Sequence, residues 1–429
     1  MTQNATSELP VLRVLDEEFW LDPHAAVRAA REQGPVACTP FGSPVVLRYD
    51  DCVAALADER LINDYDALLT RNGITDGPLW DWWKLAMLNN NPPVHTRLRS
   101  MVSRAFTPRA VARAEAITRE RAVALLAPYL EQGHIELVRD FCEPLPIAVV
   151  CEMIGFPRGD VAEFDRWVAD LGMMFSERVT PEMRATAERA MHELGAYVAE
   201  HTAERRRSGS RVDDLFGALI ESTDTGDRLS HDELVAMIVN LLFGALDTTR
   251  GSLSMFVALL VQRQDLLDTL RRDRSLLASA VEELLRLEPP VGEISRVARE
   301  RVQLAGVDIE PGTFVGLSVL AANRDPERFE RPDDVVLDRY RAGIAPSILS
   351  FGRGIHHCLG NALARLEVRT VLDVLLEQCS RIELASDEPP RHVPFLRVRC
   401  VQSLPLTLRA SHAATARRAA RTVGSQSGE

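Results

Sequence analysis

The sequence has no pair of cysteines at the C-x-x-C spacing, and its cysteine count, seven, is odd. Both features argue against a disulfide framework and against a structural zinc site. We therefore expect a protein of a reducing compartment whose thiols stay free. The cysteines are Cys38, Cys52, Cys142, Cys151, Cys358, Cys379 and Cys400.

A secretory signal and a membrane-spanning run are also lacking. Residues 1–10 are polar and do not have a charged segment followed by an apolar one. The longest apolar stretch without a charge, residues 234–246, is interrupted by Asn240 and is too short to cross a bilayer. The sequence therefore predicts a cytoplasmic protein that does not bind a membrane.

Positive charge is in deficit, and nothing resembles a linker. The chain has 50 lysine and arginine residues against 62 aspartate and glutamate residues, so its net charge is -12. This balance argues against nucleic acid as the main partner. No stretch rich in glycine, serine or proline divides the 429 residues. We expect a flexible N-terminus at 1–10, one large domain at 11–410, and a disordered tail at 411–429.

The central part of the chain has a helical pattern. From about residue 95 to 285, prolines stand mainly at junctions and apolar residues recur at helical spacing. Ser230 and Glu233 have the spacing of a capping box, and the apolar pattern after them runs to about Val261. A helix of roughly 30 residues is about 45 Å long, so we expect a spine across the domain. Residues 61–90, in contrast, look irregular and aromatic.

β structure is predicted only in small amounts. The segment 296–322 partly alternates apolar and polar residues, with turns at Gly306 and Gly312, which is typical of short hairpins. A second β region is expected at 394–408. The sequence thus predicts a mainly α fold with small β-sheets.

Cys358 differs from the other cysteines in its surroundings. Gly352 and Gly354 precede it and Gly360 follows it, so a tight loop leads into a helix. The positive end of a helix dipole would stabilise a thiolate here, and the glycines let backbone amides approach the sulfur. Such a loop suits a single axial thiolate below a haem iron. The alternative is an ordinary buried thiol.

The run from Phe351 to Gly360 fills every fixed position of the pattern Phe-Gly-x-Gly-x-His-x-Cys-x-Gly. It resembles the haem-ligand loop of the cytochrome P-450 superfamily. The resemblance implies a single large triangular domain that holds haem b, with Cys358 as the iron ligand and Phe351 and Gly352 at the cofactor. It extends from about residue 10 to 410 and, without a membrane anchor, is closest to the bacterial branch.

The long helix carries the string GALDTT at 244–249, which places an acid and two alcohols on an apolar face. Taken alone, the string indicates a kinked helix whose hydroxyls bond back to the preceding turn. It also resembles the distal-helix signature of the superfamily, which implies that Asp247 and Thr248 are catalytic and deliver protons for dioxygen cleavage. Ala245 stands where that signature usually has glycine. Arg250 is unusual at its position, and the sequence assigns it no role.

Four further residues resemble partners of the two haem propionates, because partly buried carboxylates need cations or hydrogen-bond donors. His95 and Arg99 lie four positions apart on one helix face, in a string similar to the superfamily's Asp-Pro-Pro-x-His-x-x-x-Arg. Asn91 stands where that string usually has an acid. Arg296 and His356 match the remaining two donors.

Glu283 and Arg286 lie three positions apart on one helix face. They resemble the superfamily's structural Glu-x-x-Arg pair, which normally gains an arginine from a later Pro-x-Arg-Phe string. In this sequence Asp334 occupies the place of that arginine. We therefore expect the network around the pair to be wired differently.

The resemblance implies a monooxygenase that hydroxylates a small apolar organic substrate in natural-product biosynthesis. Electrons would come from NAD(P)H through a reductase and a ferredoxin, which would dock on the Cys358 side. By position, the pocket would be apolar, with polar groups at Asn240, Glu293 and Ser295. The docking face would carry Arg99, Arg104, Arg353 and Arg365. The pocket segments would be 84–90, 168–174, 239–248, 291–295 and 394–396.

Three alternatives stay open. The chain could couple aromatic rings oxidatively without inserting oxygen. It could also be a non-catalytic haem-binding sensor, although the sequence shows no output domain. A peroxide-driven enzyme would share the fold, but such enzymes typically have Arg-Pro where this chain has Asp247 and Thr248.

Overall fold

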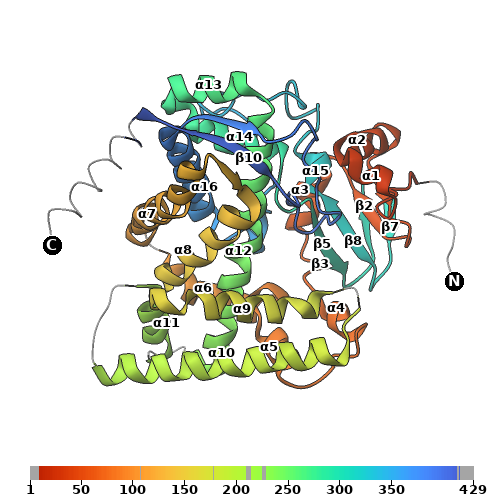
Figure 1. Ribbon diagram of the computed structural model, residues 1–429. Helices are drawn as coiled ribbons and strands as arrows, with labels where there is room; N and C mark the ends of the chain where they lie inside the picture. Colours follow the sequence, from red (N-terminus) through yellow and green to blue (C-terminus); the bar gives the residue numbers. More distant parts are fainter. Residues whose placement is uncertain are drawn as a thin grey trace.

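The computed structural model describes residues 9–106, 108–176, 178–208, 214–224, 229–412 and 415. Helices form most of this part of the chain, and the β structure is confined to short strands (Figure 1). The predicted N-terminus at 1–10 and tail at 411–429 lie almost entirely outside the described residues. The boundaries at 11 and 410 therefore stay a prediction.

A long helix, α12 (His231–Val261), runs through the middle of the molecule (Figure 1). The Ser230 hydroxyl accepts a hydrogen bond from the Glu233 amide at 3.1 Å, and the Glu233 carboxylate accepts one from the Ser230 amide at 2.9 Å. The predicted capping box and spine are therefore confirmed. Among the described helices, α12 alone is long and apolar enough to cross a bilayer, and half of its most apolar window is buried inside this fold.

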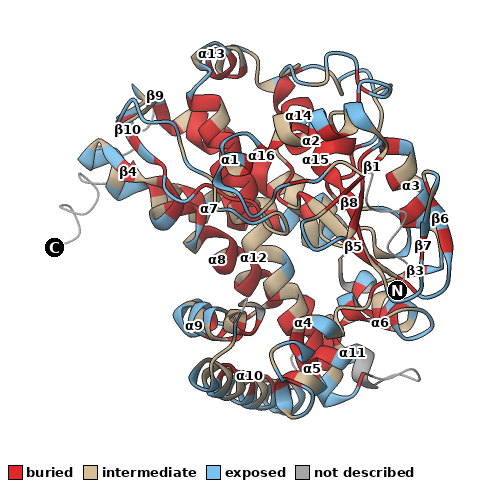
Figure 2. Cartoon of the chain, turned by 90° about the vertical axis from the view of Figure 1, so that its right-hand side faces the viewer, coloured by how far each residue is buried: buried red, intermediate tan, exposed pale blue. Residues whose placement is uncertain are grey.

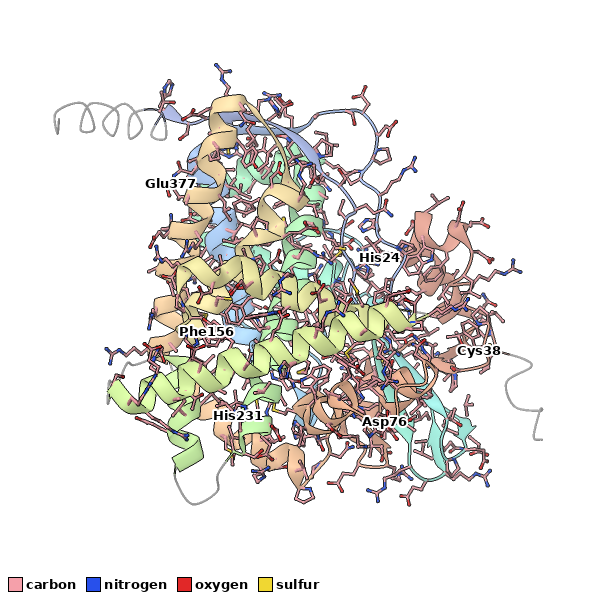
Figure 3. The ribbon with its side chains drawn as sticks, turned by 60° about the horizontal axis from the view of Figure 1, so that its bottom comes forward. His24, Cys38, Asp76, Phe156, His231 and Glu377 are labelled. Atoms are coloured by element: carbon pink, nitrogen blue, oxygen red, sulfur yellow. The ribbon has the colours of Figure 1, made fainter. Side chains whose placement is uncertain are left out.

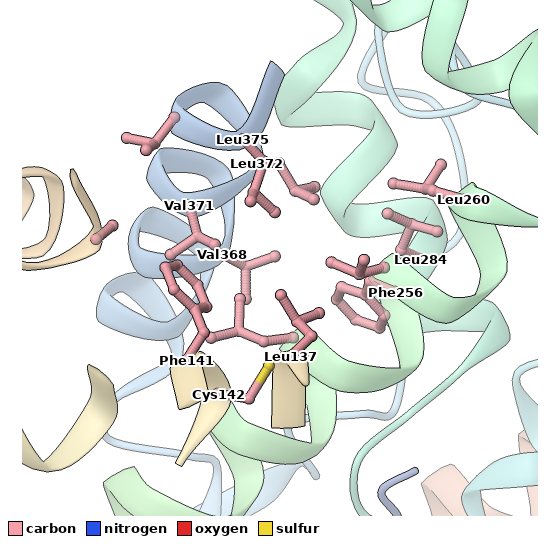
Figure 4. Close-up of a cluster of buried hydrophobic side chains, with 14 of the residues drawn as sticks. Leu137, Phe141, Cys142, Phe256, Leu260, Leu284, Val368, Val371, Leu372 and Leu375 are labelled. Carbon is pink, nitrogen blue, oxygen red and sulfur yellow. The ribbon is translucent and has the colours of Figure 1, made fainter. Parts of the chain in front are cut away.

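The two halves of α12 belong to different hydrophobic cores. The C-terminal half packs with the helices α7 (Pro108–Gln132), α8 (Pro144–Ile154), α14 (Leu277–Leu287) and α16 (Asn361–Gln378), and Phe256 and Leu260 lie in that core (Figure 4). The N-terminal half packs with α5 (Pro78–Leu85), α6 (Val94–Ala105), α9 (Val161–Gly172), α10 (Pro181–Ser208) and α11 (Leu215–Asp224). Phe243, Ala245 and Leu246 still pack against the N-terminal core, and the C-terminal core begins on α12 at Leu253.

The prediction that residues 61–90 are irregular is wrong. The short helix α4 (Asp66–Thr70) and the helix α5 form there. Proline stands at the start of α5, and Leu79, Trp82 and Trp83 are buried on one helix face. This spacing of i, i+3 and i+4 is helical, but the many aromatic residues around it obscured it.

The smaller helices complete the covering of the molecule, and the outer surfaces of α9 and α10 are exposed (Figure 2). The smaller helices are α1 (Glu17–Leu21), α2 (Pro23–Gln33), α3 (Tyr49–Ala57), α13 (Gln264–Arg272) and α15 (Val319–Ala322).

The largest sheet has the strand order β1-β2-β8-β5-β3. Within it, Arg296 on β5 stands opposite Val315 on β8. Its strands are β1 (Val36–Cys38), β2 (Pro44–Val46), β3 (Leu61–Ile62), β5 (Glu293–Ala298) and β8 (Phe314–Ser318). The strands β6 (Val302–Leu304) and β7 (Val307–Ile309) form a hairpin whose turn contains Gly306 at φ +86°. The predicted hairpins are confirmed.

A second sheet joins β4 (His134–Glu136), β10 (Pro405–Ala410) and β9 (Cys379–Leu384). The second β region is therefore shorter than the predicted 394–408. Residues 394–404 form an irregular segment: the backbone at 396 and 399 bonds to the loop after α14, and Val401 makes only an isolated bridge, to His392.

Candidate functional site

Cys358 lies in a tight loop before α16. All seven cysteines are described; six are buried and only Cys358 is partly exposed. Its amide donates to the Phe351 carbonyl at 2.9 Å, which closes the loop. Gly352 and Gly354 have φ angles of +64° and +74°, and a Cβ at Gly354 would come within 2.8 Å of the Leu56 carbonyl oxygen. Gly354 is therefore required both by backbone conformation and by space.

The surroundings of the Cys358 sulfur act on its pKa in opposite directions, and their net effect is to raise it. Burial raises the pKa of Cys358, while the Gly360 amide and the guanidinium groups of Arg99 and Arg365 lower it. Arg365 also lies over the Phe351 ring, 4.2 Å from its centroid. The loop thus presents one sulfur with an amide and two cations near it, which partly offset the cost of burying a thiolate.

The structure brings the four predicted propionate partners into one cluster. The rings of His95 and His356 are 4.2 Å apart between centroids. Arg99 donates to the carbonyl of His357 at 2.6 Å. Arg296 is only 5% exposed. Burial, followed by cationic neighbours, lowers the pKa of His95 to about 4 and that of His356 to about 3.

This cluster is short of acceptors. His95 Nδ1 and His356 Nε2 are buried and have no hydrogen-bond partner among the described residues. The cations that act on His356 are the guanidinium groups of Arg296 and Arg99, while His95, with a pKa of about 4, is uncharged at neutral pH. Buried donors without acceptors are costly, so an anionic group is the partner that fits. The two carboxylates of haem b would meet this need, and Cys358, on the adjacent loop, would supply a sulfur ligand to its iron.

A metal ion bound by protein groups alone is not supported. In the part of the chain that the structure describes, no three His, Cys, Asp or Glu side chains gather where they could hold a metal ion.

The acid and alcohol predicted to deliver protons lie on α12 beside α16. Thr248 donates to the Gly244 carbonyl at 2.8 Å, so its hydroxyl bonds back to the preceding turn. The neighbouring Thr249 donates to Glu367 on α16 at 3.5 Å. Glu367 is buried, and this burial raises its pKa to about 8. The segment thus faces the helix that follows the Cys358 loop.

Arg250, to which the sequence assigned no role, pairs with the predicted catalytic acid. Its guanidinium lies 3.1 Å from Asp247 and 3.6 Å from Glu143, which directly follows a π-helical turn at 138–142. The extra residue in that turn directs Glu143 toward α12. The spacing of Asp247 and Arg250, three positions on one helix, was the only sequence signal for this contact.

The pair Glu283–Arg286 is completely buried, and its third member is an arginine that the sequence analysis did not identify. Arg286 donates to Glu283 at 2.7 and 2.9 Å, and Arg339 donates to the same carboxylate at 2.9 Å. Asp334 contributes only its carbonyl, which accepts from Arg286 at 3.2 Å. The expected rewiring is confirmed: the missing arginine is supplied five residues later.

The polar groups predicted for the pocket have local roles. Asn240 donates to the Ala236 carbonyl within α12 at 2.7 Å. Burial raises the pKa of Glu293. The carbonyl of Ser295 accepts from the Tyr65 hydroxyl at 3.1 Å, beside Arg296.

Comparison with known proteins agrees with this site. A sequence model of the cytochrome P450 family matches residues 160–399. The chain belongs to the cytochrome P450 family. The family implies a haem-iron cofactor, and its members similar to this chain include named monooxygenases.

Two bacterial cytochrome P450 relatives match most of the chain. The monooxygenase PikC of Streptomyces venezuelae is 36% identical over 425 residues, which are 95% of this chain and 96% of PikC. The polyketide biosynthesis cytochrome P450 PksS of Bacillus subtilis is 32% identical over 407 residues, which are 91% of this chain and 97% of PksS. The crystal structure of CalO2 matches with a TM-score of 0.86 and 29% identity, over 93% of this chain and 99% of CalO2. The protein is therefore a bacterial-type P450 monooxygenase with the mainly α, triangular P450 fold.

Proposed function

We propose that Cys358 binds the iron of haem b and that this P450 hydroxylates a small apolar organic molecule in natural-product biosynthesis, in the cytoplasm. The observation that supports this most strongly is the pairing of one cation-flanked thiol with two buried, unpartnered imidazoles. When bound, the haem supplies dioxygen activation and transfer of one oxygen atom to carbon. The protein supplies the binding, orientation and protons.

The proposed roles follow from position. Cys358 would hold the iron, and Phe351 and Gly352 would shape the loop below it. A Cβ at Gly352 would lie 3.5 Å from Ile294, so β5 closes over this loop. The propionates would be held by His95, Arg99, Arg296 and His356.

Asp247 and Thr248 would deliver protons. In the structure the Asp247 carboxylate pairs with Arg250, and the Thr248 hydroxyl donates to Gly244. Each group can exchange this bond for a hydrogen bond to a water molecule or a reacting oxygen.

Replacing Asp247 by asparagine is expected to lower the rate of product formation about 10²-fold, because the amide cannot relay a proton. Electrons should then appear as hydrogen peroxide in place of product. Product, peroxide and consumed reduced cofactor are measured together. Ser252→Ala is the matched control, since Ser252 lies one turn later on α12 and bonds only to the Thr248 carbonyl, at 2.9 Å. Unchanged product yield in Asp247→Asn would remove the proposed role.

The redox partner that we propose is a ferredoxin, supplied with electrons from NAD(P)H by a reductase. Of the arginines predicted on the docking face, Arg353 is exposed, Arg365 pairs with Glu282 at 2.6 Å, and Arg99 bonds to the His357 carbonyl. The side chain of Arg104 lies outside the described residues. Arg353 is therefore the member whose charge is most available to an acidic partner.

Replacing Arg353 by glutamate is expected to raise the ferredoxin concentration needed for half-maximal electron transfer about tenfold at low salt, because charge complementarity speeds encounter. Stopped-flow reduction of the haem measures this. Arg381→Glu is the control, since Arg381 lies beyond the far end of α16. Equal effects of the two variants, or none from Arg353→Glu, would place the docking face elsewhere.

A further inference from the structure

The irregular segment 393–399 is held more firmly than its lack of secondary structure suggests. The Arg399 amide donates to the Pro290 carbonyl at 2.7 Å, and the Gly292 amide donates to the Leu396 carbonyl at 2.8 Å. The segment therefore runs along the loop that joins α14 to β5, paired with it at two points.

The side chain of Arg399 adds a third attachment. The residue is 3% exposed, and its guanidinium lies 2.7 Å from the Glu288 carboxylate and 3.2 Å from the Pro289 carbonyl. Arg324 approaches Glu288 at 3.4 Å from the other side. The planar fork of an arginine holds a carboxylate and a carbonyl through separate nitrogens in a fixed geometry, whereas a lysine offers all its donors from one nitrogen.

His24, on α2 (Figure 3), reaches this cluster. Its Nε2 lies 3.0 Å from the Glu288 carboxylate. Burial is the main reason that the pKa of His24 is lowered to about 4. At neutral pH the imidazole is therefore uncharged, and the guanidinium groups of Arg399 and Arg324 balance the charge of Glu288.

Two glycines are required by the closeness of Arg399. A Cβ at Gly251 on α12 would lie 2.2 Å from the Arg399 carbonyl oxygen. A Cβ at Gly292 would lie 3.0 Å from both the Arg399 side chain and the Leu396 carbonyl oxygen. Gly251 stands three residues after Thr248, so the Arg399 backbone touches α12 one turn from the proposed proton relay.

Two residues before Arg399, the segment approaches β5 through Tyr65. The Arg397 guanidinium is 5.9 Å from the centroid of the Tyr65 ring, and Tyr65 donates to the carbonyl next to Arg296. The segment thus spans from α12 to β5, the two elements that carry site residues, and Phe395 at its centre is 47% exposed.

We propose that the Arg399–Glu288 ion pair fixes residues 393–399 as a rigid wall of the substrate pocket and so determines how well the pocket holds bulky ligands. This rests on the proposed function, since it assumes that haem lies between α12 and the Cys358 loop. Arg399 and Glu288 are positioning residues that act through the segment and do not touch the reacting atoms. Loss of the pair leaves a mobile wall, which must be ordered again each time a bulky ligand binds.

The test compares two azoles that bind haem iron through nitrogen, imidazole and the much larger clotrimazole. Their dissociation constants are measured by spectral titration of the haem-loaded protein. In Arg399→Gln, the ratio of the clotrimazole constant to the imidazole constant is expected to rise at least fivefold over wild type. Arg399→Lys keeps the charge but loses the planar guanidinium, and it is expected to raise this ratio at least twofold. It replaces Arg399→Gln in the test if that variant does not fold.

Arg324→Gln is the matched control, because it also removes a guanidinium from Glu288. The Arg324 side chain bonds to the Leu287 carbonyl and the Asp333 carboxylate and not to the segment. Its ratio should stay within twofold of wild type. A smaller rise in the Arg399 variants, no change, a fall, or an equal rise in Arg324→Gln would overturn the proposal. Failure of the proposed function is recognised separately, since wild type would then give no azole spectrum at all.

Discussion

Replacing Arg286 by methionine is expected to destabilise the folded protein by about 3–5 kcal/mol, because it leaves the buried Glu283 carboxylate short of its main counter-charge. Neither side chain of the pair is exposed. Arg286 also donates to the carbonyls of Asn323 and Pro332, at 3.0 and 2.6 Å, and so joins α14 to the segment before the Cys358 loop. The substitution therefore removes a support of the site as well as an ion pair.

Urea unfolding of the haem-loaded protein measures this loss. Arg271→Met is the control, because Arg271 and Asp268 have the same i, i+3 spacing on α13 and lie 2.8 Å apart, but Asp268 is 62% exposed. The cost of breaking such an exposed pair is expected to be below about 1 kcal/mol. If the two variants lost similar free energies of unfolding, burial would not be the reason that the Glu283–Arg286 pair stabilises the fold.

Replacing Cys358 by serine is expected to abolish turnover. A serine hydroxyl stays protonated at neutral pH and does not donate electron density to iron as a thiolate does. Product formation and the iron content of the purified variant measure the effect. Cys151→Ser on α8 is the control, since burial raises the pKa of Cys151 to about 12 and keeps that thiol inert. Turnover that survives in Cys358→Ser would remove sulfur ligation from the account.

The sequence was most informative where a pattern is local. The capping box of Ser230 and Glu233 uses atoms three residues apart, so the start of α12 could be predicted to the residue. The glycines around Cys358 likewise predicted a tight loop, and Gly352 and Gly354 adopt the positive φ angles that such a loop needs. The conclusion that the chain is a cytochrome P450 came from a resemblance, which the family comparison then confirmed.

The sequence was least informative where partners come from distant elements. Arg339 joins Glu283 across 56 positions, and Arg399 joins Glu288 across 111. No pattern in one sequence indicates which of many arginines reaches a given carboxylate. The strand predicted at 394–408 was wrong over 394–404 for the same reason, because apolar content predicted a strand while the backbone bonded to residues 290 and 292.

Some features of the predicted site follow from a local sequence pattern, and others follow only from the fold. His95 and Arg99 could be placed on one helix face from their spacing, but only the fold sets His95 against His356 at 4.2 Å. Asp247 could be identified from its string, and the i, i+3 spacing indicates its pairing with Arg250, yet the approach of Glu143 to Arg250 joins distant parts of the chain.

The central claim is that the Cys358 sulfur binds haem iron. The most direct measurement is the absorption spectrum of the reduced, haem-loaded wild-type protein under carbon monoxide. The account predicts the band characteristic of thiolate-ligated haem. A protein that loads haem but shows only the band of haem bound through nitrogen or oxygen would contradict it.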